Sequence, residues 1–292
     1  MSIGGGEADE SSYATMAADA SLRKKFIDST IALARRYDFY GVDLDWEYPE
    51  TAMDMQNMGQ LFSEWKSAIT AEASTSGKPA LLLTAAVYFS QKLWLQDDLG
   101  YPVQSIAQNL DWVNAMCYDF YGPWTPDQTG APAALYDPNS DLSTSYGIQS
   151  WLDAGLPAQK LVMGMPLYGH SWKLKSTTQT GIGAPATVED ALGDMTYAEI
   201  RNFIGERSAT EVFDAATVSV YAYAGLDWVG YDNEESVGIK VQFAKQKGLP
   251  GYFFWNVGQD SNWALSTKAS DTWGAGIKFE DFNAFQKPVS YS

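Results

Sequence analysis

Apolar runs that alternate with amphipathic stretches are the feature of this 292-residue chain that most constrains its fold. The apolar runs end in turn residues, as buried strands do, and the stretches between them carry apolar side chains at helical spacing. Strands that alternate with helices are typical of a parallel sheet covered by helices, so an α/β fold is predicted. The expected strands are residues 2–6, 40–48, 80–89, 111–122, 160–172 and 248–257, and the expected helices are 22–37, 54–74, 105–109, 146–154, 197–204 and 235–247.

The alternation of strands and helices is interrupted between residues 173 and 232. This region contains many turn residues, one helical segment and β-prone stretches such as 216–232. A small α+β insertion before the last barrel strand is therefore predicted. It divides the chain into a first barrel part at 1–172, the insertion at 173–232, and a second barrel part with a C-terminal tail at 233–292.

Composition excludes several classes of partner. The formal net charge of −17 argues against nucleic acid or an anionic membrane surface and favours a neutral or cationic ligand. No stretch approaches the ~20 apolar residues that a membrane span needs. Eleven tryptophans and seventeen tyrosines offer aromatic faces on which sugars and other flat ligands can stack. A soluble protein without nucleic-acid or membrane partners is expected.

The chain contains one cysteine, Cys117, and one histidine, His170. A single cysteine excludes an intrachain disulfide and a cysteine-based zinc site. A single histidine also argues against the Ser-His-Asp and Cys-His arrangements of nucleophilic catalysis. We expect a structural role for His170, and we expect no metal or other cofactor.

The stretch 40–50, YGVDLDWEYPE, places Asp43, Asp45 and Glu47 at every second position. In an extended strand these side chains share one face, about 6.6–7 Å apart along the chain. A half-exposed strand of an antiparallel sheet would simply solvate them, but in a parallel sheet covered by helices neither face meets bulk water. Mutual repulsion and desolvation should therefore leave at least one proton on the row near neutral pH.

A retained proton makes a carboxyl group useful as a general acid. The alternative is a Mg²⁺ or Ca²⁺ site, although successive carboxylates on a straight strand are poorly placed to surround one ion. We favour general acid catalysis on a glycosidic bond, with Glu47 nearest the carboxyl end of the strand, where the active sites of barrels open.

Several motifs resemble glycoside hydrolase family 18, the chitinase family built on an eight-stranded TIM barrel. Residues 40–47 are similar to its DGxDxDxE signature, and the match continues in order from Ser2 to about Gly274. The amino-acid sequence of these segments is most similar to that of plant class V chitinases. The further matching segments are SIGGG at 2–6, AMCYDFYGPW at 115–124, GMPLYGHSW at 164–172 and GYFFWNV at 251–257.

This resemblance implies a retaining, substrate-assisted hydrolysis without a second enzymic carboxylate as nucleophile. Glu47 would protonate the glycosidic oxygen while the acetamido carbonyl of the substrate attacks the anomeric carbon. Asp45 would orient the acetamido group, and Asp43 would tune Asp45 by sharing a proton or a hydrogen bond. Tyr118 would donate a hydrogen bond to the acetamido oxygen.

The resemblance also implies residues that contact the sugar. Trp255 would form the floor at the cleavage point, and the insertion would supply one wall of the groove. The expected substrate-binding residues are Met116, Asp119, Tyr168 and Trp255 in the barrel, and Trp228, Tyr231 and Asp232 in the insertion.

Two departures from the family pattern affect these expectations. Tyr40 stands where the signature has its first Asp, at a position expected to be buried. In addition, SIGGG corresponds to the third strand of the family barrel, so six of eight strands are expected and the chain is read as lacking the first two, together with a signal peptide. Because unpaired strand edges expose the barrel interior, we expect low stability and weak activity or none.

The leading expectation is an endo-acting chitinase that cleaves β-1,4-linked N-acetylglucosamine chains or relatives such as lipochitooligosaccharides. The alternative is a lectin-like protein that binds chitin oligosaccharides without turnover, and a third reading is an inhibitor or storage relative of the same barrel. The resemblance further implies a monomer located outside the cell or in the vacuole, with a role such as plant defence.

Overall fold

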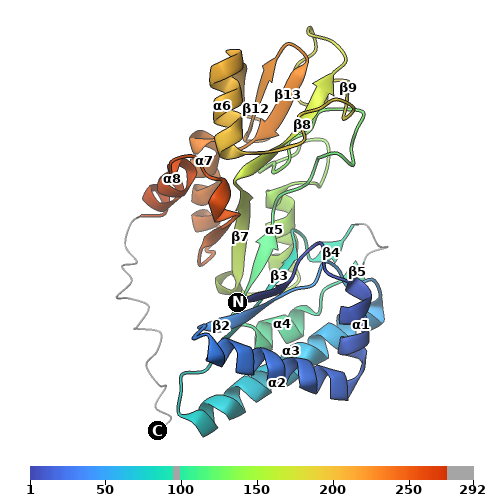
Figure 1. Ribbon diagram of the computed structural model, residues 1–292, viewed down its shortest axis with the longest axis vertical. Helices are drawn as coiled ribbons and strands as arrows, with labels where there is room; N and C mark the ends of the chain where they lie inside the picture. The colour runs from blue at the N-terminus through green and yellow to red at the C-terminus, as the bar shows by residue number, and fades with distance from the viewer. Residues whose placement is uncertain (95–98, 275–292) are drawn as a thin grey trace.

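The computed structural model describes residues 1–94 and 99–274 (Figure 1). Its centre is a six-stranded sheet in the order β1-β2-β3-β6-β7-β14, in which every neighbouring pair is parallel. The α/β architecture and the six predicted parallel strands are confirmed. The strands are β1 (Ser2–Gly4), β2 (Gly41–Asp45), β3 (Leu82–Tyr88), β6 (Trp112–Met116), β7 (Leu161–Pro166) and β14 (Tyr252–Trp255).

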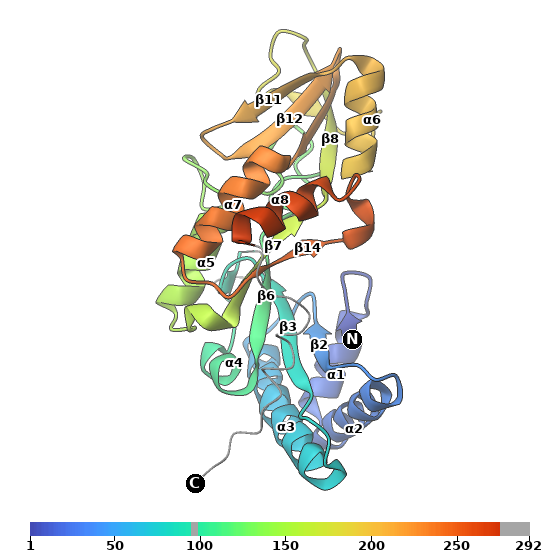
Figure 2. The same ribbon diagram turned by 90° about the vertical axis from the view of Figure 1, so that its left-hand side faces the viewer.

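The sheet curls as an open half-barrel, and helices cover its outer face (Figures 1 and 2). Helices α1 to α4 lie against the half formed by the first strands, whereas α7 and α8 pack on each other beside β7 and β14. The helix α1 lacks a clear apolar stripe, which is why helical spacing did not predict it. The helices of the barrel are α1 (Glu10–Ala18), α2 (Ala20–Arg36), α3 (Ala52–Ser76), α4 (Val103–Asn109), α5 (Thr144–Asp153), α7 (Glu234–Gln246) and α8 (Ala264–Trp273).

Helix α3 shows how the sequence determines one of these elements. Thr51 and Asp54 form a reciprocal capping box at its start, and Gly77, with φ of 69°, ends it in the left-handed region. The apolar stripe expected from its spacing packs into the core. The buried members of that stripe are Met55, Met58, Leu61, Phe62 and Trp65.

Close backbone contact between β1 and β2 depends on glycine. Gly4 pairs with Asp45, and a Cβ atom at Gly4 would lie 1.8 Å from the carbonyl oxygen of Asp45. The φ angle of Gly4, 123°, is also one that other residues rarely adopt. The SIGGG segment can therefore lie directly against the strand that carries the carboxylates.

The insertion is a separate antiparallel sheet, in the order β10-β8-β13-β12-β11, with β9 paired to β8. Helix α6 (Tyr197–Arg207) packs against this sheet through Ile200 and Phe203, at the top of Figure 1. A small hairpin of β4 (Lys92–Leu93) and β5 (Leu99–Gly100) follows β3. The strands of the insertion are β8 (Tyr168–Leu174), β9 (Ala186–Thr187), β10 (Asp194–Thr196), β11 (Thr210–Asp214), β12 (Ser219–Ala224) and β13 (Asp227–Tyr231).

The expected strand at 160–172 is in fact two strands of different sheets. Strand β7 ends at Pro166, the buried Leu167 connects the sheets, and β8 begins at Tyr168. The backbone N–H of Leu167 donates to Trp255, while its carbonyl accepts from Tyr197 of the insertion. Because both strands are buried, apolar residues continue across the junction. The sequence pattern therefore does not show where one strand ends and the next begins. The sheet of the insertion thus begins at residue 168, before the expected boundary at 173.

Among the described helices, none is both long enough and apolar enough to cross a membrane. Most of the expected C-terminal tail lies outside the described residues, which end at Gly274.

Candidate active site

Asp43 is anchored by donors from three other strands. Ser2 Oγ of β1 donates to Asp43 Oδ2 at 2.7 Å, and Thr84 Oγ1 of β3 donates to Oδ1 at 2.6 Å. Asn114 Nδ2 of β6 also donates to Oδ1, at 3.2 Å. Asp43 therefore acts on Asp45 through its charge, and the carboxyl group that hydrogen-bonds with Asp45 is that of Glu47. Polar residues within otherwise apolar strands, such as Thr84, were the signal that could have revealed these donors.

Asp45 is the buried member of the row, with 9% of its surface exposed. Burial, together with the negative charges of Glu47 and Asp43, raises its pKa from the ordinary 3.8 to about 7. One of its oxygens, Oδ1, is enclosed and has no hydrogen-bond partner within the described structure. Asp45 therefore retains a proton near neutral pH, and it has a free acceptor for a donor group of a ligand.

Glu47 follows β2 and lies half-buried beside the glycines of the SIGGG segment. A Cβ atom at Gly6 would lie 3.8 Å from Glu47 Oε1. Burial raises the pKa of Glu47. A hydrogen bond with Tyr48 lowers this pKa, and the negative charge of Asp119 raises it. A carboxyl group with a raised pKa at the carboxyl end of a parallel strand is suited to general acid catalysis.

Tyr118 lies in the loop that follows β6 and faces the acidic groups. Burial raises its pKa well above the ordinary value, and the charges of Asp119, Glu47 and Asp45 raise it further. Its ring makes an edge contact with Tyr168 at 6.3 Å between centroids. The Tyr118 hydroxyl therefore stays protonated and can serve as a hydrogen-bond donor.

Asp119 and Tyr168 are brought together beside this tyrosine. The Tyr168 hydroxyl donates to Asp119 Oδ1 at 2.8 Å, and His170 Nε2 lies 2.8 Å from the same oxygen. The expected strand at 111–122 ends at Met116, and Asp119, beyond its end, has a φ angle of 60°. The structure thus places Asp119 and Tyr168 next to the carboxylate row.

Met116 and Trp255 end two other strands of the sheet. Met116 is the last residue of β6, and Trp255 is the last residue of β14, with 52% of its surface exposed. Half-exposed aromatic surface at the carboxyl end of a barrel strand is available for a ligand. Both residues therefore lie where the sequence placed them, although no sugar is present to show a contact.

The three insertion residues expected at the groove are buried instead, so this expectation is wrong. Trp228 is fully enclosed, and its Nε1 donates to the Thr180 carbonyl at 2.9 Å. The Tyr231 hydroxyl donates to Glu211 at 2.5 Å. Asp232 forms a buried ion pair with a lysine of α7. The β-prone pattern of this segment reflects the interior of the insertion, because its aromatic residues face the core.

Tyr40 is also placed differently from the expectation. Its side chain is 74% exposed just before β2, whereas the sequence suggested a buried position. The departure from the family signature therefore lies at the surface, away from the three carboxylates.

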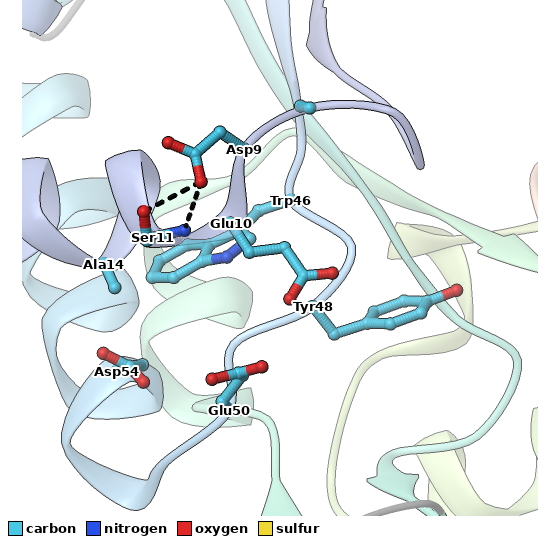
Figure 3. A pocket seen from close by; sticks show the side chains of 9 residues that line it. Asp9, Glu10, Ser11, Ala14, Trp46, Tyr48, Glu50 and Asp54 are labelled. Carbon is cyan, nitrogen blue, oxygen red and sulfur yellow. Dashed lines mark hydrogen bonds between the residues drawn. The ribbon is translucent and has the colours of Figure 1, made fainter.

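A cavity of about 370 Å³ lies beside the carboxylate segment but not at the row itself (Figure 3). Trp46 and Tyr48 line it, since alternate side chains of the segment face away from Asp45 and Glu47. Asp9 caps α1 through Ser11, as the dashed lines show, and Asp54 belongs to the capping box of α3. Neither Asp45 nor Glu47 lines this cavity, so we do not assign the reaction to it.

Within residues 1–94 and 99–274, no group of three or more His, Cys, Asp or Glu side chains could hold a metal ion. A half-barrel with a row of acids at the carboxyl end of its strands, and a protonated tyrosine facing them, defines an enzyme of the TIM-barrel class that uses acid catalysis.

Comparison with known proteins identifies the family. The family model described as "Glycosyl hydrolases family 18" matches residues 1–260. The chain therefore belongs to this family. A class V chitinase of Arabidopsis thaliana is 50% identical over 278 residues, which cover 94% of this chain and 73% of the relative.

Two solved structures share the fold. The crystal structure of a class V chitinase mutant from Nicotiana tobaccum in complex with NAG4 is 48% identical, with a TM-score of 0.91, over 95% of this chain and 80% of that one. The chitinase-like agglutinin RobpsCRA from Robinia pseudoacacia is 46% identical, with a TM-score of 0.86, over 94% of this chain and 80% of that one. These similarities confirm the family resemblance and the TIM-barrel-like fold that the motifs indicated.

Proposed function

We propose that this protein hydrolyses β-1,4-linked N-acetylglucosamine chains, that is, chitin and its oligomers. The observation that carries the proposal is the pair Asp45 and Glu47: a buried carboxyl group with an unpartnered oxygen lies beside a second carboxyl group with a raised pKa. The similarity to class V chitinases, one of them solved in complex with NAG4, supports this choice of substrate.

The geometry accounts for each step of a substrate-assisted reaction. Glu47 gives its proton to the glycosidic oxygen, and the bond from that oxygen to the anomeric carbon breaks. The acetamido oxygen of the same sugar attacks the anomeric carbon and forms an oxazolinium ion. Water then opens this ring from the other side, with Glu47 taking the proton, so the product retains its configuration.

Asp45 and Tyr118 would hold the acetamido group during this reaction. The unpartnered Oδ1 of Asp45 would accept the acetamido N–H, which would stabilise the positive charge that develops there. The Tyr118 hydroxyl would donate to the acetamido oxygen, which needs a donor that stays protonated. Trp255, Met116 and Tyr168 would line the sugar site around them.

The proposal extends to a further substrate class, to the oligomeric state and to the location of the protein. Lipochitooligosaccharides would fit the same chemistry, since they carry the same β-1,4 linkage. We also propose a monomer located outside the cell or in the vacuole, with a role in plant defence. The support for these points is the family resemblance.

The test of the proposal is hydrolysis of N-acetylglucosamine hexamer by the unmodified protein and by Glu47→Gln. The substitution keeps the size of the side chain but removes the acid, so we expect turnover to fall roughly 10²–10⁴-fold. Glu206→Gln, an identical change on the exposed surface of α6, should leave turnover unchanged. The first product should be the β-anomer, as NMR of fresh digests would show.

The second candidate function is carbohydrate binding without turnover. The similarity to a chitinase-like agglutinin favours it. Hexamer binding without hydrolysis, equal in the unmodified protein and in Glu47→Gln, would support this candidate and contradict the enzyme. Retention of Asp43, Asp45, Glu47 and Tyr118 in one cluster is the observation that favours the enzyme.

A further inference from the structure

The side chain of His170 bridges two carboxylates that come from different parts of the fold. Its Nε2 lies 2.8 Å from Asp119 Oδ1, and its Nδ1 lies 2.6 Å from Asp194 Oδ1. The histidine itself is buried, with 3% of its surface exposed. Asp194 was not identified from the sequence, because a single acidic residue in an insertion carries no signal.

With both carboxyl groups ionised, the two hydrogen bonds favour a charged imidazole ring. A neutral imidazole has one N–H, and an ionised carboxylate can only accept, so a neutral ring could satisfy only one of the two contacts. Only a ring protonated on both nitrogens donates to both acids. Burial lowers the pKa of His170, but hydrogen bonds to Asp119 and Asp194 and their charges outweigh this and raise it to about 9. The same contact lowers the pKa of Asp194.

The bridge joins the insertion to the loop that follows β6. His170 and Asp194 are paired residues of the antiparallel strands β8 and β10, so the register of the insertion sheet places them together. Asp119 belongs to the barrel, and its Oδ1 also accepts from Tyr168. The groups that face His170 are these two acids, Tyr168, and the ring of Trp124 at 5.3 Å between centroids.

Asp119 in turn acts on the acidic site. Its charge raises the pKa of Glu47, and it is the largest contribution to the raised pKa of Tyr118 after burial. The orientation of the Asp119 carboxylate therefore affects both the proposed acid and the proposed acetamido donor. The contacts of Asp119 Oδ1 with the Tyr168 hydroxyl and with His170 Nε2 hold this carboxylate in one orientation.

We propose that His170, held by Asp194, is a positioning residue that fixes the Asp119 carboxylate toward Glu47 and Tyr118. This inference rests on the proposed hydrolase function for its effect on rate, but the charge and contacts of His170 do not depend on it. The insertion thus contributes to the site through Asp194 and His170 rather than through the buried Trp228, Tyr231 and Asp232.

The first experiment is an NMR titration of the imidazole, which is unambiguous because the chain has one histidine. We expect His170 in the unmodified protein to stay protonated to about pH 8 or above. In Asp194→Asn the midpoint should fall, since one of the two carboxylates that stabilise the charge is lost. Glu189→Gln, which removes one exposed negative charge from the same insertion, should leave the midpoint unchanged. A midpoint near 6.5 in the unmodified protein would overturn the proposal.

The second experiment is a double-mutant cycle on hexamer turnover. Asp194 has 64% of its side chain exposed, so Asp194→Asn should still fold. We expect kcat to fall on the order of 10-fold, by loss of orientation at the site. In an Asp119→Asn background the same substitution should have no further effect, because the residue it acts through is already gone. Equal losses in both backgrounds would contradict positioning through Asp119.

The two experiments separate this proposal from the proposed function. Absence of turnover in the unmodified protein, with a high His170 midpoint that falls in Asp194→Asn, would reject the hydrolase and support the bridge. Normal turnover in Asp194→Asn, with an unchanged midpoint, would reject the bridge and leave the hydrolase intact.

Discussion

Asp43 and Asp45 lie on the same strand but differ in burial and in hydrogen-bond partners. Asp43 accepts hydrogen bonds from Ser2, Thr84 and Asn114, each on a different strand of the sheet. Asp45 is more deeply buried, and one of its oxygens has no partner among residues 1–94 and 99–274. A buried polar atom without a partner costs free energy unless a ligand or water meets it. Such a cost at Asp45 indicates a site kept for binding rather than for stability.

The raised pKa of Asp45 predicts a pH-dependent stability. Between the ordinary pKa of 3.8 and the folded value of about 7, the folded state holds a proton that the unfolded state has lost. The free energy of unfolding should therefore decrease as pH rises from 4 to 7, by up to ~1.4 kcal/mol per pH unit from this group. Denaturant melts across this range should show a flatter profile for Asp45→Asn. A profile equally steep in both proteins would contradict a buried, protonated Asp45.

At the scale of elements, the junction between the insertion and the barrel contains a buried ion pair. Lys240 of α7 contacts both oxygens of Asp232, which follows β13, at 2.5 and 2.6 Å. Its Nζ also donates to the carbonyl of Ala133, and Ser236 Oγ donates to Asp232 at 2.7 Å. Both charged side chains are almost fully enclosed. The pair therefore sets how β13 continues into α7.

Removing one charge from this pair should destabilise the protein strongly. Lys240→Met leaves Asp232 buried without its counter-charge, and we expect a loss of about 3–5 kcal/mol in the free energy of unfolding. Lys240→Met combined with Asp232→Leu removes both charges, so it should be more stable than the single variant. Thermal or denaturant melts would measure both. A single variant as stable as the unmodified protein would show that the pair contributes little.

At the scale of the whole molecule, the parallel sheet is open. In the part of the chain that the structure describes, β1 and β14 are the ends of the six-stranded sheet, and each pairs with a single neighbour in it. Within the described residues, the outer edges of these two strands therefore have no strand partner in this sheet.

The sequence by itself determined the parallel strand–helix order, the carboxylate row and the family, because these depend on periodicity and on motifs that lie within single segments. It also predicted that Asp43, Asp45, Glu47 and Tyr118 meet, since the carboxyl ends of parallel strands lie at one edge, and their roles in the reaction stay a prediction. Only the tertiary structure decided which aromatic residues of the insertion are buried, where β7 gives way to β8, and that Asp194 meets His170. These features depend on contacts between segments far apart in the chain, and local sequence patterns do not predict such contacts.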